Sequence, residues 1–558
     1  MWRREVGLFV AACILVSVVL LVGNNHWQRL IHRTAPVPTG TGPDYSHAPA
    51  TWVGRQACAE CHAQADSVWT GSDHDLAMQL PRPETITADF DNATYTHYGV
   101  TSTFYREGEK YMVRTDGPDG KLTDFEVAYV FGYFPLEQFL IRFPDGRMQC
   151  LNVCWDTTPA ADGGQRWFHL YPDDETPATD LFHWTGPLQN WNFMCADCHS
   201  TNLKRNYDVA SNTFETTWSE LDVSCEACHG PGSRHIQWEK AQAQGLRPAN
   251  LDGARGLVAN LKSPDNGLWV FEPGEATARR TEPLASRIET ESCARCHARR
   301  GPLTEEHEYG QRFLDNYRLI LLDEELYYAD GQNQDEVYVY GSFMQSKMYA
   351  AGVTCSDCHD YHSTRTLGEA DQVCARCHRA EVFDTPEHHF HQPDKGGDSC
   401  LDCHQQARKV MVVDARRDHS FRIPRPDLSL ELGTPNACND CHTDKSLQWS
   451  QDAIVKWYGA DRKQGGHYGV ALHAGRTGAP LALDRLRALL QAEDQPNMAK
   501  ATGLSLMNRY AAAADVAEVV TALKNEDPLV RAAAVDALAT SPAERQYTLC
   551  QPLLDDPV

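Results

Sequence analysis

The chain has 558 residues, with 51 Lys or Arg against 76 Asp or Glu, which gives a formal net charge of −25 at pH 7. An acidic surface repels phosphate, so the composition excludes nucleic-acid binding through a basic face, and we expect no nucleic-acid partner. With 42% hydrophobic and 23% charged residues, the chain is globular and long enough for two or three domains.

The first 24 residues are expected to be a membrane anchor or signal segment. Arg3 and Arg4 precede an apolar run over residues 6–22 that no charge interrupts. The run lacks a small-residue cleavage site at its end, which favours an uncleaved anchor over a cleaved signal peptide. The arginines keep the N-terminus in the cytoplasm, so we expect a periplasmic or extracytoplasmic protein anchored to the inner membrane. Residues 25–50 are rich in Pro, Gly and Thr and are expected to be a linker.

A Cys-x-x-Cys-His motif occurs eight times between residues 58 and 442 and includes 16 of the 20 cysteines. In c-type cytochromes, the two thiols of this motif bond to the vinyl groups of haem and the histidine binds the iron. Zinc sites and disulfide frameworks give no reason for a histidine after every cysteine pair. We therefore expect eight covalently bound haem c groups in a domain over residues 51–445.

The motifs, numbered 1 to 8 in chain order, specify where each haem is attached. The expected thioether cysteines are Cys58, Cys61, Cys195, Cys198, Cys225, Cys228, Cys293, Cys296, Cys355, Cys358, Cys374, Cys377, Cys400, Cys403, Cys438 and Cys441. The expected proximal iron ligands are His62, His199, His229, His297, His359, His378, His404 and His442.

Sixteen of the 24 histidines lie outside the motifs and can supply the second axial ligands. We expect those closest to a motif to be distal ligands, namely His74, His235, His362, His388, His391 and His419, with His389 in the same cluster. Weaker candidates are His97, His169, His183, His307, His467 and His473. Iron with two histidine ligands is saturated, which suits electron transfer and disfavours substrate binding. Because histidines outnumber irons, the count leaves open whether one iron keeps a vacant position.

Residues 89–170, between the first two motifs, alternate β-branched and aromatic residues with turn sequences. This pattern predicts a small β-rich insertion of hairpins in a haem domain that is otherwise built of short helices and long loops. Cys150 and Cys154 in the insertion could form a disulfide or remain unpaired. About 48 residues per haem leave so little protein that we expect the porphyrins to form much of the core and to lie close together.

A tyrosine-rich stretch between motifs 4 and 5 also contains Arg299, Arg300 and His307. These groups could be proton donors around one haem. Aromatic packing against porphyrin is the interpretation that we favour.

Residues 446–558 are rich in Ala and Leu and are expected to form a HEAT-like α-solenoid. Asp527 and Pro528 cap a predicted helix, and prolines recur at Pro496, Pro528 and Pro557 with the period of stacked helix pairs. We expect a concave protein-docking surface, and a repeat domain that is incomplete at its C-terminus.

The wording of several motifs resembles the multihaem cytochromes c related to hydroxylamine oxidoreductase and to the tetrahaem electron carriers of nitrifying bacteria. The strings that carry this resemblance are CAECH (58–62) followed by WTGSDH (69–74), CEACHGPGSRH (225–235), VTCSDCHDYH (353–362) and DHSFRIP (418–424). Residues 131–139, 183–186 and 338–343 resemble a branch that joins eight haems to C-terminal HEAT or tetratricopeptide repeats. The resemblance implies that His74, His235, His362 and His419 are distal ligands. No Cys-x-x-Cys-Lys occurs, so the lysine-ligated haem of the related nitrite reductases is not expected.

These features predict a mainly α, outward-facing octahaem cytochrome that carries electrons along closely spaced, mostly bis-histidine haems. Its expected partners are redox proteins, quinol-linked or other cytochromes, which dock on the helical repeats. The alternative is an octahaem oxidoreductase that acts on small nitrogen or sulfur compounds, such as hydroxylamine or nitrite, at one open haem. The sequence does not specify catalytic residues for that alternative.

Overall fold

The computed structural model describes residues 45, 48–246, 248, 253–262, 266–393, 395–460, 462, 466–510 and 517–558. The chain divides into two compact units, one with residues up to Trp52 and Pro231–Val258, the other with Val53–Gly230 and Ala259–Val558. In the first unit, the segment before Trp52 is bonded to α6 (Ser233–Ala243), where the Thr51 amide donates to Ser233 Oγ at 2.8 Å. Among the described residues, no helix is both long and apolar enough to cross a bilayer, and the expected anchor lies outside them.

Most motifs lie on short helices, as the sequence predicts, because one helical turn brings the two thiols and the histidine to the same face. These helices are α2 (Arg55–Ala59), α5 (Cys225–His229), α7 (Ile288–His297), η4 (Cys355–Asp357), α11 (Ala370–Ala375), α14 (Cys400–His404) and α16 (Ala437–Cys441). In motif 1, for example, the His62 amide donates to the Cys58 carbonyl at 2.9 Å. Motif 2 is irregular, because the His199 amide donates to Ala196 at 3.2 Å and not to Cys195.

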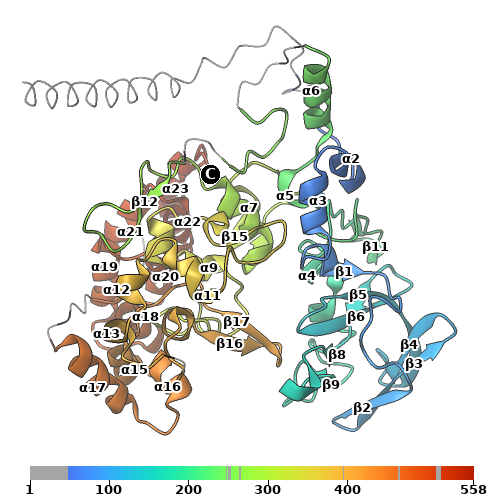
Figure 1. Ribbon diagram of the computed structural model, residues 1–558, viewed down its shortest axis with the longest axis horizontal. Helices are drawn as coiled ribbons and strands as arrows, with labels where there is room; N and C mark the ends of the chain where they lie inside the picture. Colours follow the sequence, from blue (N-terminus) through green and yellow to red (C-terminus); the bar gives the residue numbers. More distant parts are fainter. Residues whose placement is uncertain are drawn as a thin grey trace, which may run out of the picture. The chain divides into compact units, whose positions relative to one another are not determined.

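The region between motifs 1 and 2 forms a nine-stranded antiparallel sheet of order β2-β3-β4-β5-β6-β8-β9, with β1 on β5 and β7 on β6 (Figure 1). The strands are β1 (Met78–Gln79), β2 (Ala93–His97), β3 (Val100–Glu107), β4 (Lys110–Asp116), β5 (Leu122–Phe131), β6 (Leu136–Arg142), β7 (Met148–Cys150), β8 (Val153–Asp156) and β9 (Arg166–His169). The sheet begins before residue 89 because Met78 pairs with Phe131.

The sheet is larger than the small insertion that we expected, because it nearly closes on itself and builds its own core. Its two edge strands meet where the ring of His97 on β2 stacks on that of His169 on β9 with centroids 3.7 Å apart. Phe104 on β3 and Trp167 on β9 stack in the same way at 3.5 Å. Both of these aromatic side chains belong to the buried core of the sheet.

The C-terminal region is helical, which confirms that part of the prediction. Its helices are α17 (Leu447–Tyr458), α18 (Tyr468–Thr477), α19 (Ala482–Gln491), α20 (Asn497–Met507), α21 (Ala517–Ala522), α22 (Pro528–Ala537) and α23 (Ala543–Cys550). As the Asp-Pro pair predicts, Asp527 caps α22 by accepting a hydrogen bond from the Leu529 amide at 2.9 Å.

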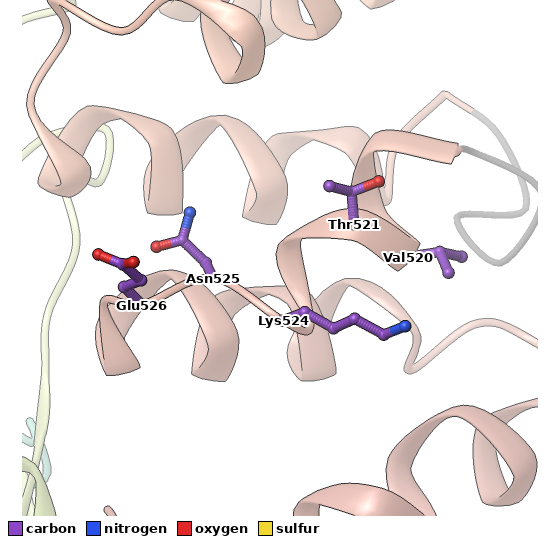
Figure 2. A pocket seen from close by; sticks show the side chains of 5 residues that line it. All are labelled: Val520, Thr521, Lys524, Asn525 and Glu526. Atoms are coloured by element: carbon purple, nitrogen blue, oxygen red, sulfur yellow. The ribbon is translucent and has the colours of Figure 1, made fainter.

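Apolar side chains of α18 to α22 share one buried core with Leu322, Tyr327 and Tyr340 of the haem domain. The solenoid and its docking surface stay predictions. A hollow on this region is lined by Val520, Thr521, Lys524, Asn525 and Glu526 (Figure 2). Its lining contains no cysteine or histidine, so it takes no part in haem attachment.

The remaining elements are short, and all but η6 lie between motifs. They are α3 (Ala63–Trp69), η1 (Asp75–Ala77), η2 (Ala160–Asp162), η3 (Pro187–Gln189), α4 (Trp191–Met194), β10 (Tyr207–Asp208), β11 (Thr213–Phe214), β12 (Trp269–Val270), β13 (Arg279–Arg280), β14 (Arg300–Pro302), α8 (Phe313–Asn316), β15 (Tyr317–Leu319), α9 (Tyr340–Phe343), α10 (Lys347–Ala350), α12 (Ala380–Phe383), α13 (Pro386–His389), β16 (Ala407–Val410), β17 (Asp414–Arg417), α15 (Pro426–Leu432) and η6 (Gln551–Leu553).

Candidate functional site

Four motif histidines face a second histidine from another part of the chain. The pairs and their ring-centre separations are His297 with His74 at 6.4 Å, His359 with His419 at 6.5 Å, His404 with His388 at 6.1 Å and His442 with His391 at 6.2 Å. Two imidazoles that bind one metal from opposite sides at about 2.0 Å have ring centres roughly 6.3 Å apart. The separations therefore fit an iron between each pair. His389 and His391 are also 6.4 Å apart, so separation alone does not identify a ligand pair.

Hydrogen bonds to backbone carbonyls orient several of these rings. Nδ1 of His404 donates to the Arg422 carbonyl at 2.7 Å, and Nδ1 of His419 donates to the Arg417 carbonyl at 2.9 Å. Nδ1 of His391 likewise donates to the His389 carbonyl at 2.5 Å. A ring whose Nδ1 carries the proton presents Nε2 as the metal ligand, so this arrangement fits the expected role.

Three of the weaker histidine candidates have contacts within the sheet domain. His183 uses both ring nitrogens, because Nδ1 bonds to Thr185 Oγ1 at 2.8 Å and Nε2 to Asp116 Oδ2 at 3.0 Å. His97 and His169 stack on each other at the edges of the sheet. Burial and the neighbouring His97 lower the pKa of His169 to about 4. These three histidines stabilise the sheet domain and are not placed to bind an iron.

Two motif histidines of the described residues do not face a second imidazole. The His199 ring meets Phe131 edge to face at 5.3 Å, and its Nδ1 donates to the Ala77 carbonyl at 2.9 Å. The His378 ring meets Phe383 at 5.6 Å. His362, an expected distal ligand, contacts Tyr361 at 4.8 Å.

His235, the remaining expected distal ligand, lies on α6 in the first unit, where Nδ1 donates to the Arg255 carbonyl at 3.0 Å. Its role stays a prediction, as do the second ligands at motifs 1 and 3.

Thiols of different motifs lie beside one another. In four pairs the second thiol raises the pKa of the first, and these pairs are Cys58 with Cys225, Cys198 with Cys296, Cys293 with Cys355 and Cys400 with Cys374. Burial and the Cys296 thiol raise the pKa of Cys228 to about 11. In the same way, burial and the thiol of Cys438 raise the pKa of Cys403 to about 11. Motifs 1, 3, 4 and 5 are thus linked in series, as are motifs 6, 7 and 8, and motif 2 joins at motif 4.

Motifs 5 and 6 are linked in the same way, by a thiol of one motif that raises the pKa of a thiol in the other. Burial, Asp357 and the thiol of Cys377 raise the pKa of Cys358 to about 12. All eight attachment sites therefore belong to one connected series, and motif 4 is its branch point.

The cysteines of the sheet domain are not paired with each other. Cys150 Sγ lies 3.9 Å from Cys195 Sγ, whereas Cys154 Sγ contacts the Leu151 carbonyl at 3.8 Å. No disulfide joins the described cysteines. Of the two alternatives, the structure favours unpaired thiols.

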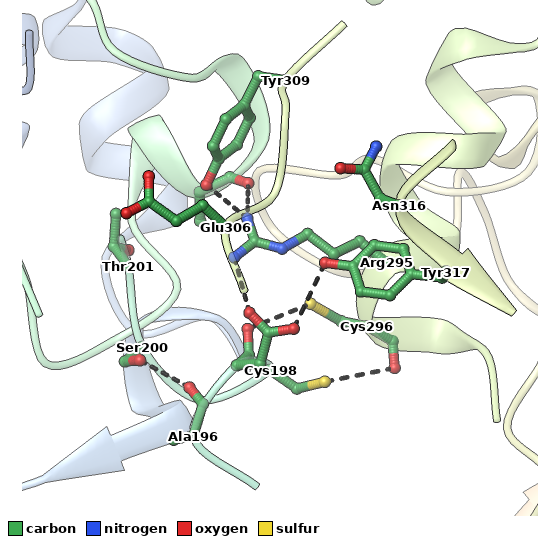
Figure 3. Close-up of polar contacts among 12 residues, drawn as sticks. Ala196, Cys198, Ser200, Thr201, Arg295, Cys296, Glu306, Tyr309, Asn316 and Tyr317 are labelled. Atoms are coloured by element: carbon green, nitrogen blue, oxygen red, sulfur yellow. Dashed lines mark hydrogen bonds and ion pairs between the residues drawn. The ribbon is translucent and has the colours of Figure 1, made fainter. Parts of the chain in front are cut away.

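A buried polar cluster lies at the contact between motifs 2 and 4 (Figure 3). Asp197 of motif 2 accepts from Arg295 Nη2 of motif 4 at 3.1 Å and from Arg300 Nη2 at 2.6 Å. Arg295 Nη1 also donates to Tyr309 Oη at 2.5 Å, and the Tyr317 hydroxyl lies 3.4 Å from Asp197 Oδ2. Burial acts to raise the pKa of Asp197, but the two guanidinium groups hold it well below its ordinary value.

The neutral members of this cluster stay neutral at pH 7. Burial raises the pKa of Tyr309 to about 12, and it also raises the pKa of Tyr317. Burial and the charge of Arg295 lower the pKa of His307 to about 3. Tyr317 and Tyr327 both lie in the hydrophobic core. The Tyr317 hydroxyl also reaches Asp197, and the Tyr309 hydroxyl accepts from Arg295.

Sequence reasoning missed Asp197 and Arg295, although a signal was present. The residue before the second cysteine is Asp in motifs 2, 5, 7 and 8 and Arg in motifs 4 and 6. A repeated charge at a variable position of the motif indicates a role beyond haem attachment.

The comparisons with known proteins agree with this chemistry. Residues 185–230, which contain motifs 2 and 3, match the family described as cytochrome c554 and c-prime. No curated protein sequence matches the chain significantly. The family match and the repeated motifs support a multihaem c-type cytochrome with a haem-based redox function.

Two solved structures resemble the chain. The outer cell wall cytochrome OcwA is 17% identical, with 87% of this chain and 99% of that chain covered and a TM-score of 0.45. The octaheme sulfite reductase MccA of Wolinella succinogenes is 14% identical, with 68% and 59% covered and a TM-score of 0.30. At these scores the likeness does not establish a common fold. The relation to hydroxylamine oxidoreductase stays a prediction.

Proposed function

We propose that the chain is an outward-facing, membrane-anchored octahaem c-type cytochrome that carries electrons to or from a redox partner protein. The observation that carries this proposal is the set of four histidine pairs with ring centres 6.1 to 6.5 Å apart. Haem c, when bound, supplies one-electron redox chemistry at each motif. Paired histidines close both axial positions, so the irons they hold exchange electrons and do not bind substrate.

The connected series of thiols supports transfer along the chain. Motifs 1, 3, 4 and 5 are linked in that order by thiols that shift the pKa of a neighbouring thiol, and motifs 5, 6, 7 and 8 continue the series. Haems attached to adjoining thiols lie close to each other, so electrons pass between them without a mobile carrier. The net charge of −25 favours a basic partner protein, which electrostatic attraction steers to the surface.

Spectroscopy of the purified full chain tests this function. Pyridine-haemochrome absorbance should correspond to eight c-type groups, and electron paramagnetic resonance of the oxidised protein should be dominated by low-spin iron. Replacing a facing histidine, as in His419→Ala, should convert one low-spin iron to high spin. His183→Gln is the matched control, because both of its ring nitrogens bond to protein groups. Fewer than eight haems, or no spin change in His419→Ala, would refute the proposal.

A second candidate function follows from His199. It is half-buried and oriented by the Ala77 carbonyl, yet no described histidine ring faces it. An iron held there would keep one position for a small nitrogen or sulfur compound, such as nitrite. Arg416 contributes a nearby positive charge, since burial and the Arg416 charge both lower the pKa of His199. The Arg416 guanidinium lies 5.5 Å from the centre of the Tyr338 ring. Arg416 is held by ion pairs with Glu336 at 2.7 Å and Asp414 at 2.6 Å, so an anionic substrate would compete with these carboxylates for its guanidinium.

Ligand binding separates the two candidate functions. Carbon monoxide or nitrite should change the spectrum of the reduced protein if one haem is open, and Arg416→Gln should weaken nitrite binding more than carbon monoxide binding. Arg318→Gln is the control, since Arg318 forms an ion pair with Asp536 in the C-terminal helical region. A protein whose irons are all low-spin and bind neither ligand is an electron carrier only.

A further inference from the structure

One aspartate of the haem motifs is paired with more positive charge than its single negative charge neutralises. The aspartates that precede the second cysteine in motifs 2, 5 and 8 all pair with arginine. Asp357 of motif 5 pairs with Arg280 at 3.1 Å, and Asp440 of motif 8 pairs with Arg408 at 3.1 Å. Asp197 of motif 2 pairs with two guanidinium groups, those of Arg295 and Arg300. The ion pair at motif 5 is neutral overall, whereas the cluster at motif 2 has a surplus positive charge.

The surplus charge is buried. The side chains of Arg295 and Arg300 are 5% and 8% exposed, and that of Asp197 is 15% exposed. Their other contacts are with uncharged groups. Arg295 Nη1 donates to the Ala227 carbonyl at 3.1 Å, and the Arg300 guanidinium lies 3.8 Å from the centre of the Tyr317 ring. These contacts do not cancel the charge, and Arg295 Nε has no hydrogen-bond partner among the described residues.

The other charged groups near the cluster do not remove the surplus. Arg205 adds a further positive charge that acts on Asp197. Glu306 is compensated by Lys204, with Nζ 2.5 Å from a carboxylate oxygen. Tyr309, Tyr317 and His307 are neutral at pH 7, because burial disfavours their charged forms.

The charge lies at the branch point of the haem series. Arg300 Nη2 is 3.8 Å from the Sγ of Cys198, which is an attachment atom of motif 2. Cys296 Sγ, an attachment atom of motif 4, is 4.0 Å from the Asp197 carbonyl oxygen. Two haem attachment sites therefore lie beside the same buried cluster, which has one surplus positive charge.

We propose that the surplus guanidinium charge at Asp197 raises the reduction potential of the haems attached at motifs 2 and 4, so that electrons collect at the branch point. The inference rests on the haem attachment in the proposed function. Reduction adds one electron to a ferric iron, supplied by a reduced partner protein, and no bond forms or breaks. A fixed positive charge stabilises the added electron most where water is excluded. At an effective dielectric constant of about 20, a unit charge about 10 Å away changes the reduction equilibrium roughly tenfold.

The test is a potentiometric titration of the purified full chain with its haems, followed by absorbance. Arg300→Gln should lower two of the midpoint potentials, each by about 59 mV, which corresponds to a tenfold change for one electron. Arg300→Lys keeps the charge and should leave the potentials near those of the parent protein. Arg318→Gln, a substitution at a mostly exposed arginine, should shift none of them.

A second variant, expected to shift the potentials in the opposite direction, keeps the test valid if Arg300→Gln folds poorly. Asp197→Asn keeps both guanidinium groups but removes the negative charge, so it should raise the same two potentials. Unchanged potentials in both variants, with eight haems still attached, would overturn the inference. Equal shifts in Arg300→Gln and Arg300→Lys would also overturn it, because they would assign the effect to packing. A parent protein without eight haems would instead refute the proposed function.

Discussion

The shared core between the C-terminal helices and the haem domain predicts that the two unfold together. Leu322 belongs to the haem domain, and its side chain is 0% exposed in that core. Its backbone is also held by the helices, since its amide donates to Thr502 Oγ1 at 3.1 Å and its carbonyl accepts from Arg476 Nη2 at 2.6 Å. Leu322→Ala therefore removes packing on both sides of the contact while the backbone bonds remain.

The expected cost of Leu322→Ala is about 3 to 4 kcal/mol in the free energy of unfolding, because a fully buried leucine loses its transfer energy and leaves a cavity. Guanidinium unfolding should be followed by far-ultraviolet circular dichroism, which reports the helices, and by the haem absorbance, which reports the haem domain. We expect the two transitions to coincide and to move together to lower denaturant. Leu554→Ala is the control, since Leu554 is 81% exposed and should cost less than about 0.5 kcal/mol.

Two results would refute this reasoning. A loss below about 1 kcal/mol would mean that Leu322 does not pack in a shared core. Separate transitions, with only the haem domain affected, would mean that the helices form an independent repeat domain. That outcome would support the separate repeat domain expected from the sequence.

Three further predictions concern the sheet domain, the helical region and one iron ligand. Burial and the stacked His97 lower the pKa of His169 from 6.5 to about 4, so the unfolded state binds the proton more readily and stability should fall as the pH drops from about 6.5 to about 4. Allowing for solvent screening, we expect the free energy of unfolding to fall by about 2 kcal/mol over this range. Unfolding measured as a function of pH should lose this dependence in His169→Gln, and an unchanged pH profile in that variant would contradict the assignment to His169. Asp527→Ala removes the N-cap of α22 and should cost about 1 kcal/mol in thermal unfolding, whereas Asp527→Asn should restore most of it. Gly397 has φ +80°, and a Cβ there would lie 2.7 Å from Cδ2 of His391. Gly397→Ala should therefore displace the His391 ring and create high-spin iron. Gly396→Ala is the control and should leave the iron low-spin, because a Cβ there would meet no atom within 4 Å.

Much of the haem chemistry could be predicted from the sequence alone. The Cys-x-x-Cys-His spacing matches one helical turn, so the attachment residues follow from the local pattern, and the short motif helices agree with it. The hairpin signals likewise predicted strands between motifs 1 and 2. The size of the sheet was underestimated, because closure depends on contacts such as that between Phe104 and Trp167, which lie far apart in the sequence.

The pairing of side chains was beyond sequence reasoning. His74 was an expected ligand, but nothing in its neighbourhood indicated that it faces His297. Asp197 and Arg300 are 103 positions apart, and their contact depends on how motifs 2 and 4 pack.

The chain's amino-acid pattern alone specified which residues attach haem, because that chemistry is decided within five consecutive positions. Only the three-dimensional packing decided which of the described histidines face each other and where a carboxylate meets two guanidinium groups. The physical reason is that axial ligation and buried charge depend on distances between segments that the chain brings together only when it folds.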